Sequence, residues 1–211
     1  MNRFSYSEQF DNAAWPTIGS LVTANVTTGP FGGAVADKLV LASGEVSGRV
    51  LQNATDRGDY TTFSVYAKAA ELSELGLQMR RDSSSYPLAR FDLSSGEVIN
   101  ADGFNATIVD VGDGWFRCGI SGPTNGVATS FMGIWTYTDT TGDDVSGIYL
   151  YGAQYETSLS PTEYQKKTNT LAEGGNHASQ ATASNRRSYR TDGTLHWLQD
   201  DLTDDALNSR S

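Results

Sequence analysis

Two apolar runs, residues 127–138 and 146–156, carry aromatic side chains at alternate positions. In an extended strand, such residues share one face. Flat rings on a sheet cover the apolar faces of sugars at a small entropic cost. Two interpretations stay open: the rings contact carbohydrate, or one set packs in the core or a subunit interface, where Ile148 and Leu150 compete for the core. The candidate carbohydrate-binding residues are Trp135, Tyr137, Tyr149, Tyr151 and Tyr155.

Carboxylates form a second candidate group. Asp139, Asp143 and Asp144 cluster in a predicted turn. Calcium prefers several oxygen ligands, although acids in a turn are more often solvated turn formers. A glycosidase needs two carboxylates facing each other across a cleft, and the sequence does not pair them. We therefore predict no catalytic residue, no metal site and no cofactor, and leave open only a structural calcium ion at this turn.

Histidine and cysteine are too few for the common nucleophilic or metal sites. His177 and His196 both lie near the C-terminus, without a nucleophile or a second ligand at a recognisable spacing. Cys118 is the single cysteine, so no intrachain disulfide is available, and its apolar neighbours predict a buried thiol. These patterns favour a protein that is not an enzyme.

The charge of the chain limits its partners. The net charge is −10, which argues against nucleic-acid binding and against attraction to anionic membranes. No stretch approaches the roughly 20 apolar residues of a membrane span, and the N-terminus lacks the apolar core of a signal peptide. We expect synthesis in a cytoplasm, no nucleic acid and no membrane insertion.

Short strands must position the aromatic residues. About ten apolar runs recur every 8 to 15 residues up to position 168, separated by turn residues, and the chain has 22 glycines. This spacing predicts an antiparallel all-β sandwich or barrel over residues 1–168. In 60–68, Phe63, Val65 and Ala67 share one face. Gly112 and Asp113 join two runs as a hairpin.

Residues 169–211 are different, because few of their side chains are apolar and they cannot build a core of their own. We predict an extended C-terminal arm. Two interpretations stay open: a flexible tail, or an arm that orders against a neighbouring subunit. In the second, the docking residues are Tyr189, Trp197, Arg186 and Arg187.

Five segments, in the same order, resemble a domain common in virion proteins of tailed bacteriophages. They are 6–15 (YSEQFDNAAW), 63–69 (FSVYAKA), 91–96 (FDLSSG), 111–118 (VGDGWFRC) and 146–164. The resemblance implies a jelly-roll β-sandwich like that of carbohydrate-binding modules, carried on tail fibres, tailspikes or head surfaces. It implies location in the virion after synthesis in the host cytoplasm.

The same resemblance implies a structural protein on the particle surface that contributes to recognition of host surface glycans. The alternative is a capsid decoration protein that stabilises the head without binding glycan. By analogy we expect a homotrimer, with other tail or capsid proteins as partners and host polysaccharide as a further one.

Overall fold

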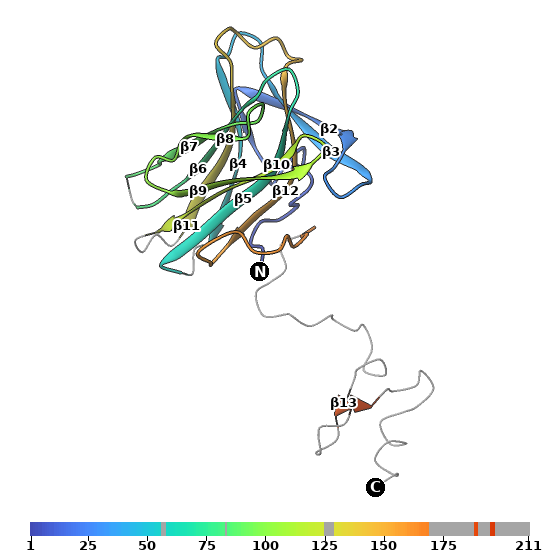
Figure 1. Ribbon diagram of the computed structural model, residues 1–211, viewed down its shortest axis with the longest axis vertical. Coiled ribbons are helices and arrows are strands. Elements are labelled where there is room, and N and C mark those ends of the chain that lie inside the picture. The colour runs from blue at the N-terminus through green and yellow to red at the C-terminus, as the bar shows by residue number, and fades with distance from the viewer. Residues whose placement is uncertain (56–57, 83, 125–128, 169–187, 190–194, 197–211) are drawn as a thin grey trace. The chain divides into compact units, whose positions relative to one another are not determined.

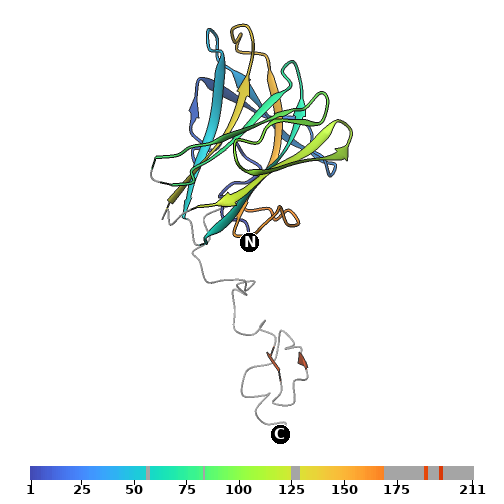
Figure 2. The same ribbon diagram turned by 60° about the vertical axis from the view of Figure 1, so that its left-hand side comes forward.

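The computed structural model describes residues 1–55, 58–82, 84–124, 129–168, 188–189 and 195–196. The chain divides into two units, Met1–Thr170 and Leu171–Ser211. The first unit is a sandwich of two six-stranded sheets in which every strand pair is antiparallel (Figures 1 and 2). This confirms the predicted all-β sandwich of jelly-roll type. None of the described segments is a helix long and apolar enough to cross a bilayer.

The sheets mix strands that are distant in sequence. The first sheet has the order β1-β4-β11-β6-β7-β8 and the second has the order β2-β3-β12-β5-β10-β9. The first contains β1 (Thr17–Ile18), β4 (Ser47–Thr55), β11 (Thr129–Tyr137), β6 (Glu74–Met79), β7 (Leu88–Asp92) and β8 (Glu97–Asn100). The second contains β2 (Ser20–Thr28), β3 (Ala34–Leu41), β12 (Gly147–Glu156), β5 (Tyr60–Ala69), β10 (Trp115–Pro123) and β9 (Asn105–Gly112).

Alternate residues of facing strands form the core. Phe63, Val65 and Ala67 of β5 are fully buried, which confirms that they share one face of this strand and shows that it is the inner face. The predicted hairpin is also present: β9 ends at Gly112, β10 begins at Trp115, and the intervening Asp113 has φ of 53°. Cys118 is buried in the same core, and desolvation raises the pKa of its thiol.

The N-terminal segment fills part of the core without forming a strand. Phe4, Phe10 and Trp15 are at most 2% exposed. Their rings pack together, with centroids 4.9 Å apart for Phe4–Trp15 and 5.1 Å for Phe10–Trp15. The Trp15 indole N–H donates to the backbone oxygens of Ser5 and Tyr6. Trp15 therefore anchors this segment to the sandwich.

In the second unit the described residues form one short antiparallel pair, β13 (Ser188–Tyr189) with β14 (Leu195–His196). Tyr189 pairs with Leu195. Arg186, Arg187 and Trp197 lie outside the described residues. The docking role of the arm stays a prediction.

Candidate functional site

Strand β11 places three aromatic side chains on the outer face of the first sheet. Phe131, Trp135 and Tyr137 occupy alternate positions and are partly exposed. They point away from the core because the residues between them point into it. The inward residues are Met132, Ile134 and Thr136, all fully buried.

Two glycines give these rings room against the sheet. A Cβ atom on Gly133 would lie 3.0 Å from Nε1 of Trp135, and one on Gly76 would lie 2.9 Å from the ring and hydroxyl of Tyr137. The Trp135 and Tyr137 rings are parallel within 10°, with centroids 6.0 Å apart. Trp135 Nε1 donates to Oε1 of Gln78 at 3.2 Å. Neighbouring strands thus fix the positions of the rings.

Arginines from two other strands pack on these rings. Arg49 of β4 lies opposite Trp135 in the register, with Cζ 4.4 Å from the Trp135 centroid and 5.5 Å from that of Phe131. Arg90 of β7 has Cζ 4.9 Å from the Tyr137 centroid. At these distances the guanidinium groups attract the ring faces. We call Arg49, Arg90, Phe131, Trp135 and Tyr137 the arginine face.

A cleft of about 500 Å³ continues the arginine face at the Tyr137 end. Its walls include Tyr137, Arg90, Glu74, Glu71 and Asp139. This volume lies in the usual range of ligand sites, roughly 300 to 1,000 Å³. Rings and cleft together form a continuous surface with apolar and charged groups.

The two glutamates of the cleft both have cationic partners. Glu71 pairs with Lys38 at 2.6 Å, and this contact lowers the pKa of Glu71. Glu74 pairs with Arg90, which raises the pKa of that guanidinium. Hydrolysis of a glycosidic bond needs a carboxylic acid that keeps its proton near neutral pH. The Lys38 contact favours the ionised form of Glu71, and this arrangement suits ligand binding.

In the acidic turn, the Asp143 carboxylate accepts hydrogen bonds from backbone amides of the same turn. Asp143 accepts hydrogen bonds from the amides of Val145 and Ser146 and from the Ser146 hydroxyl, and these bonds lower its pKa to about 2. Asp144 accepts from the amide of Ser43. No three histidine, cysteine, aspartate or glutamate side chains converge as a metal site in the described part of the chain. A calcium ion at Asp139, Asp143 and Asp144 stays a prediction.

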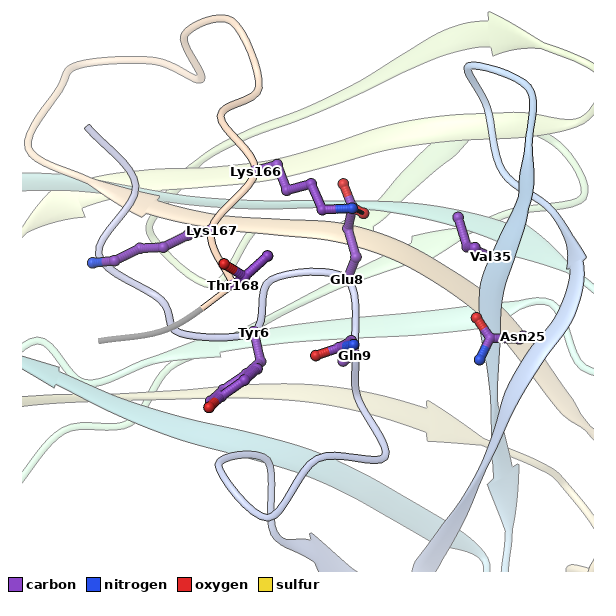
Figure 3. A pocket seen from close by; sticks show the side chains of 8 residues that line it. All are labelled: Tyr6, Glu8, Gln9, Asn25, Val35, Lys166, Lys167 and Thr168. Carbon is purple, nitrogen blue, oxygen red and sulfur yellow. Dashed lines mark ion pairs between the residues drawn. The ribbon is translucent and has the colours of Figure 1, made fainter. Parts of the chain in front are cut away.

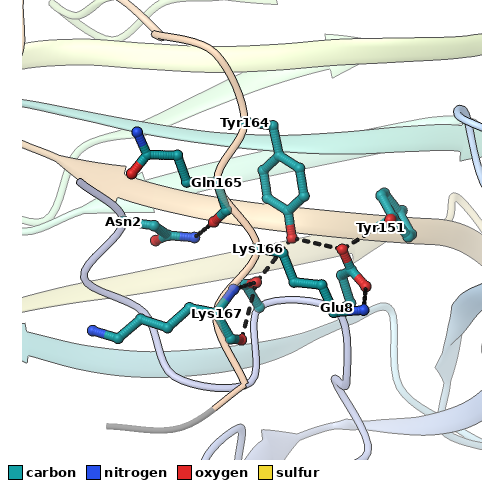
Figure 4. A network of polar contacts seen from close by, with 8 residues as sticks. Asn2, Glu8, Tyr151, Tyr164, Gln165, Lys166 and Lys167 are labelled. Atoms are coloured by element: carbon teal, nitrogen blue, oxygen red, sulfur yellow. Dashed lines mark hydrogen bonds and ion pairs between the residues drawn. The ribbon is translucent and has the colours of Figure 1, made fainter. Parts of the chain in front are cut away.

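The outer face of the second sheet carries a separate group of aromatics, which we call the tyrosine face: Tyr66, Tyr149, Tyr151 and Tyr164. The hydroxyls of Tyr151 and Tyr164 donate to Oε1 of Glu8 at 2.8 and 3.1 Å (Figure 4). Burial and the Glu8 carboxylate raise the pKa of Tyr151, and burial raises that of Tyr164. Lys166 completes the group through an ion pair with Glu8.

A small pocket of about 110 Å³ lies beside this network. Figure 3 shows it between the N-terminal segment and residues 166–168, with Tyr6, Glu8 and Lys166 among its lining residues. Its volume is below the roughly 300 Å³ of usual ligand sites. The pocket therefore does not compete with the 500 Å³ cleft as a site for a sugar.

The five predicted aromatic residues do not form one site. Trp135 and Tyr137 lie on the arginine face, whereas Tyr149 and Tyr151 lie on the tyrosine face of the other sheet. The expectation that Tyr155 shares a face with Tyr149 and Tyr151 is wrong. A bulge between Tyr151 and Gln154 shifts the register by one residue and turns the following side chains to the opposite face. Tyr155 is therefore 0% exposed and packs in the core.

Sequence reasoning missed Arg49 and Phe131, and only Phe131 has a signal that is visible in the sequence. Phe131 has the same parity as Trp135 and Tyr137, and Gly133 stands between them where a large outer side chain would crowd the rings. Arg49 could not be found in this way, because its position follows from pairing between β4 and β11.

No protein-family model matches the sequence, and no curated protein matches it. Among solved structures, the carbohydrate-binding module TmCBM61, in complex with β-1,4-galactotriose, has a TM-score of 0.50 and 8% identity over 75% of this chain and 99% of that one. The CBM22-1 xylan-binding domain of Paenibacillus barcinonensis Xyn10C has a TM-score of 0.48 and 12% identity over 77% and 95%.

The enzymatically active domain of tailspike protein 4 from bacteriophage CBA120 has a TM-score of 0.45 and 16% identity over 73% of this chain. The chain spans only 21% of that tailspike chain. At these identities the likeness concerns the fold alone. The first unit is a β-sandwich of the kind found in carbohydrate-binding modules.

Proposed function

We propose that the sandwich binds carbohydrate, without hydrolysing it, across the arginine face and the adjoining cleft. The observation that carries this proposal is the row of Phe131, Trp135 and Tyr137, partly exposed and continuous with a cleft of about 500 Å³. Sugar recognition uses such rings for apolar faces and polar groups for hydroxyls. The galactotriose complex of TmCBM61, which has a similar fold, supports the proposal.

The dimensions of the face favour an oligosaccharide over a single sugar. Tyr137 lies six positions after Phe131, which corresponds to about 20 Å along an antiparallel strand. Polar groups accompany the rings along this length: the Gln78 amide beside Trp135, and the Arg90–Glu74 pair beside Tyr137. A ligand lying along β11 would meet alternating apolar and hydrogen-bonding groups.

The resemblance of five sequence segments to tailed-phage virion proteins supports a proposal for the biological setting. We propose that the chain is displayed on a phage particle, as a homotrimer, and that the ligand is a host surface polysaccharide. Residues 169–211 would contact other virion proteins. A capsid decoration protein without glycan binding is the alternative, and it predicts no role for the arginine face.

Glycan-array binding by the full chain tests the carbohydrate proposal. We expect Trp135→Ala to weaken binding to the best glycan at least tenfold, about 1.4 kcal/mol, because it removes the central ring of the row. The matched control is Phe31→Ala, which removes a 61%-exposed aromatic ring that contacts Tyr66 on the other sheet. Equal losses in both variants, or no binding to any glycan, would contradict the proposal.

Cryo-electron microscopy of the intact particle tests the setting. Density for the sandwich on the tail would support the receptor-binding role, and density on the head would support the decoration alternative. Particles carrying a chain that stops after Thr168 test the arm. Full occupancy by that shortened chain would overturn the docking role of Tyr189, Trp197, Arg186 and Arg187.

A further inference from the structure

Arg49 differs from three other cations of the sandwich in having no carboxylate partner. Lys38, Arg90 and Lys166 pair with Glu71, Glu74 and Glu8 respectively. The Arg49 guanidinium makes no ion pair and donates no hydrogen bond to any residue that the structure describes. It is the guanidinium at the centre of the arginine face, between Phe131 and Trp135.

The orientation of this guanidinium is fixed by packing. Its Nε atom is buried and without a hydrogen-bond partner, while its terminal nitrogens are not among the buried unpaired atoms. Stacking on Trp135 at 4.4 Å and Phe131 at 5.5 Å leaves the group little freedom to turn. The edge with the terminal N–H groups is therefore the part available to a ligand.

We propose that Arg49 binds an anionic substituent of the glycan, so that the ligand is an acidic polysaccharide; this inference rests on the proposed function. A partly buried cation without a counter-ion is unfavourable, and a ligand anion at this place would relieve that cost. Guanidinium groups bind carboxylate, sulfate and phosphate oxygens through paired N–H donors. The adjacent rings would cover the apolar face of the same sugar.

The charge of the whole chain makes this position selective. With a net charge of −10, the chain as a whole repels an acidic polymer. An unpaired cation between two aromatic rings provides a local exception. An acidic chain would therefore bind along the arginine face in preference to other surfaces.

Affinity electrophoresis of the full chain in gels containing polysaccharide tests this inference. The acidic probes are polygalacturonate, hyaluronan and dextran sulfate. Their neutral counterparts are carboxyl-reduced polygalacturonate, carboxyl-reduced hyaluronan and dextran, with β-1,4-galactan as a further neutral probe. We expect the chain to bind at least one acidic probe tenfold more tightly than its neutral counterpart. Whether that probe carries carboxylate or sulfate groups then identifies the anionic group that is recognised. Added salt should weaken that binding.

The variant series separates Arg49 from general charge. Arg49→Gln should reduce acidic-probe affinity at least tenfold, and Arg49→Lys should retain part of it. The control is Arg117→Gln, because Arg117 also stacks on a ring, 5.3 Å from the Tyr66 centroid, and also has a buried unpaired Nε, but lies on the second sheet. Thermal melting establishes that each variant is folded, and the salt dependence of the unmodified chain tests the inference without any variant.

Three outcomes would overturn the inference. Equal binding of acidic and neutral probes, abolished by Trp135→Ala, would leave the proposed function intact and refute the role of Arg49. Acidic binding that survives Arg49→Gln would do the same. Absence of binding to every probe and to the glycan array would refute both.

Discussion

The outer faces of the two sheets both carry aromatic and charged side chains, but the polar groups of these side chains are bonded differently. On the tyrosine face, the Tyr151 and Tyr164 hydroxyls are bonded to Glu8. On the arginine face, the Tyr137 hydroxyl is buried without a hydrogen-bond partner among the described residues, and Arg49 has no counter-ion there. The Tyr151 and Tyr164 hydroxyls thus contribute to stability, whereas the terminal N–H groups of Arg49 are available to a ligand.

The largest effect should follow from removing the centre of the tyrosine face. Glu8 is 6% exposed, accepts two tyrosine hydroxyls and pairs with Lys166. Glu8→Ala should lower the free energy of unfolding by about 3 kcal/mol, because two half-buried tyrosine hydroxyls lose their acceptor and Lys166 loses its ion pair. Urea unfolding measures this loss, and exposed Glu97→Ala is the control. Glycan affinity of the folded fraction should not change; a parallel loss of affinity would break the division between the faces.

A matched pair of tyrosine substitutions sharpens the same contrast. Tyr164→Phe removes a hydroxyl that bonds to Ser7 and Glu8 and should cost about 1 to 2 kcal/mol. Tyr137→Phe removes a buried hydroxyl without a partner in the described structure, so the free energy of unfolding should stay equal or rise by up to about 1 kcal/mol. Chemical denaturation compares the two variants directly. Equal destabilisation would mean that the Tyr137 hydroxyl has a stabilising contact.

Displacing one ring tests whether its position matters for binding. A Cβ atom on Gly76 would lie 2.9 Å from the Tyr137 ring, so Gly76→Ala must move that ring. We expect glycan affinity to fall about three- to tenfold, that is by roughly 0.7 to 1.4 kcal/mol. Near-ultraviolet circular dichroism reports the movement. In a Tyr137→Ala background the same substitution should have no further effect on affinity, since the two sites act through one contact.

The smallest effect concerns the turn between β11 of the arginine face and β12 of the tyrosine face. The pKa of Asp143 in the folded state is about 2, below its ordinary value of 3.8. Ionised Asp143 therefore stabilises the fold above about pH 4, and this contribution is lost as the pH falls towards 2. Asp143→Asn should lower the urea midpoint slightly at pH 7 and not at pH 2. A difference that persists at pH 2 would assign the effect to something other than charge.

The fold could be predicted from local alternation, whereas the site depends on pairing between distant strands. Period-two patterns such as Phe63, Val65 and Ala67 define inner faces without knowledge of neighbours. Tyr155 broke this rule, because the bulge at Gly152, where φ is +57°, reverses the parity of β12. The contact between Arg49 and Trp135 joins residues 86 positions apart, and only the register of β4 on β11 brings them together.

The bonding of Ser7 to Lys167 has a mechanical consequence. The Ser7 amide donates to the Lys167 oxygen at 2.8 Å, and the Lys167 amide donates to the Ser7 hydroxyl at 2.9 Å. Ser7 in turn accepts from the amide of Ala153 in β12. Tension applied along the chain beyond Thr168 would load this clamp before it could peel β12 from its sheet. If the domain is attached through residues beyond Thr168, this clamp would help it to resist force from a ligand bound elsewhere on the sandwich.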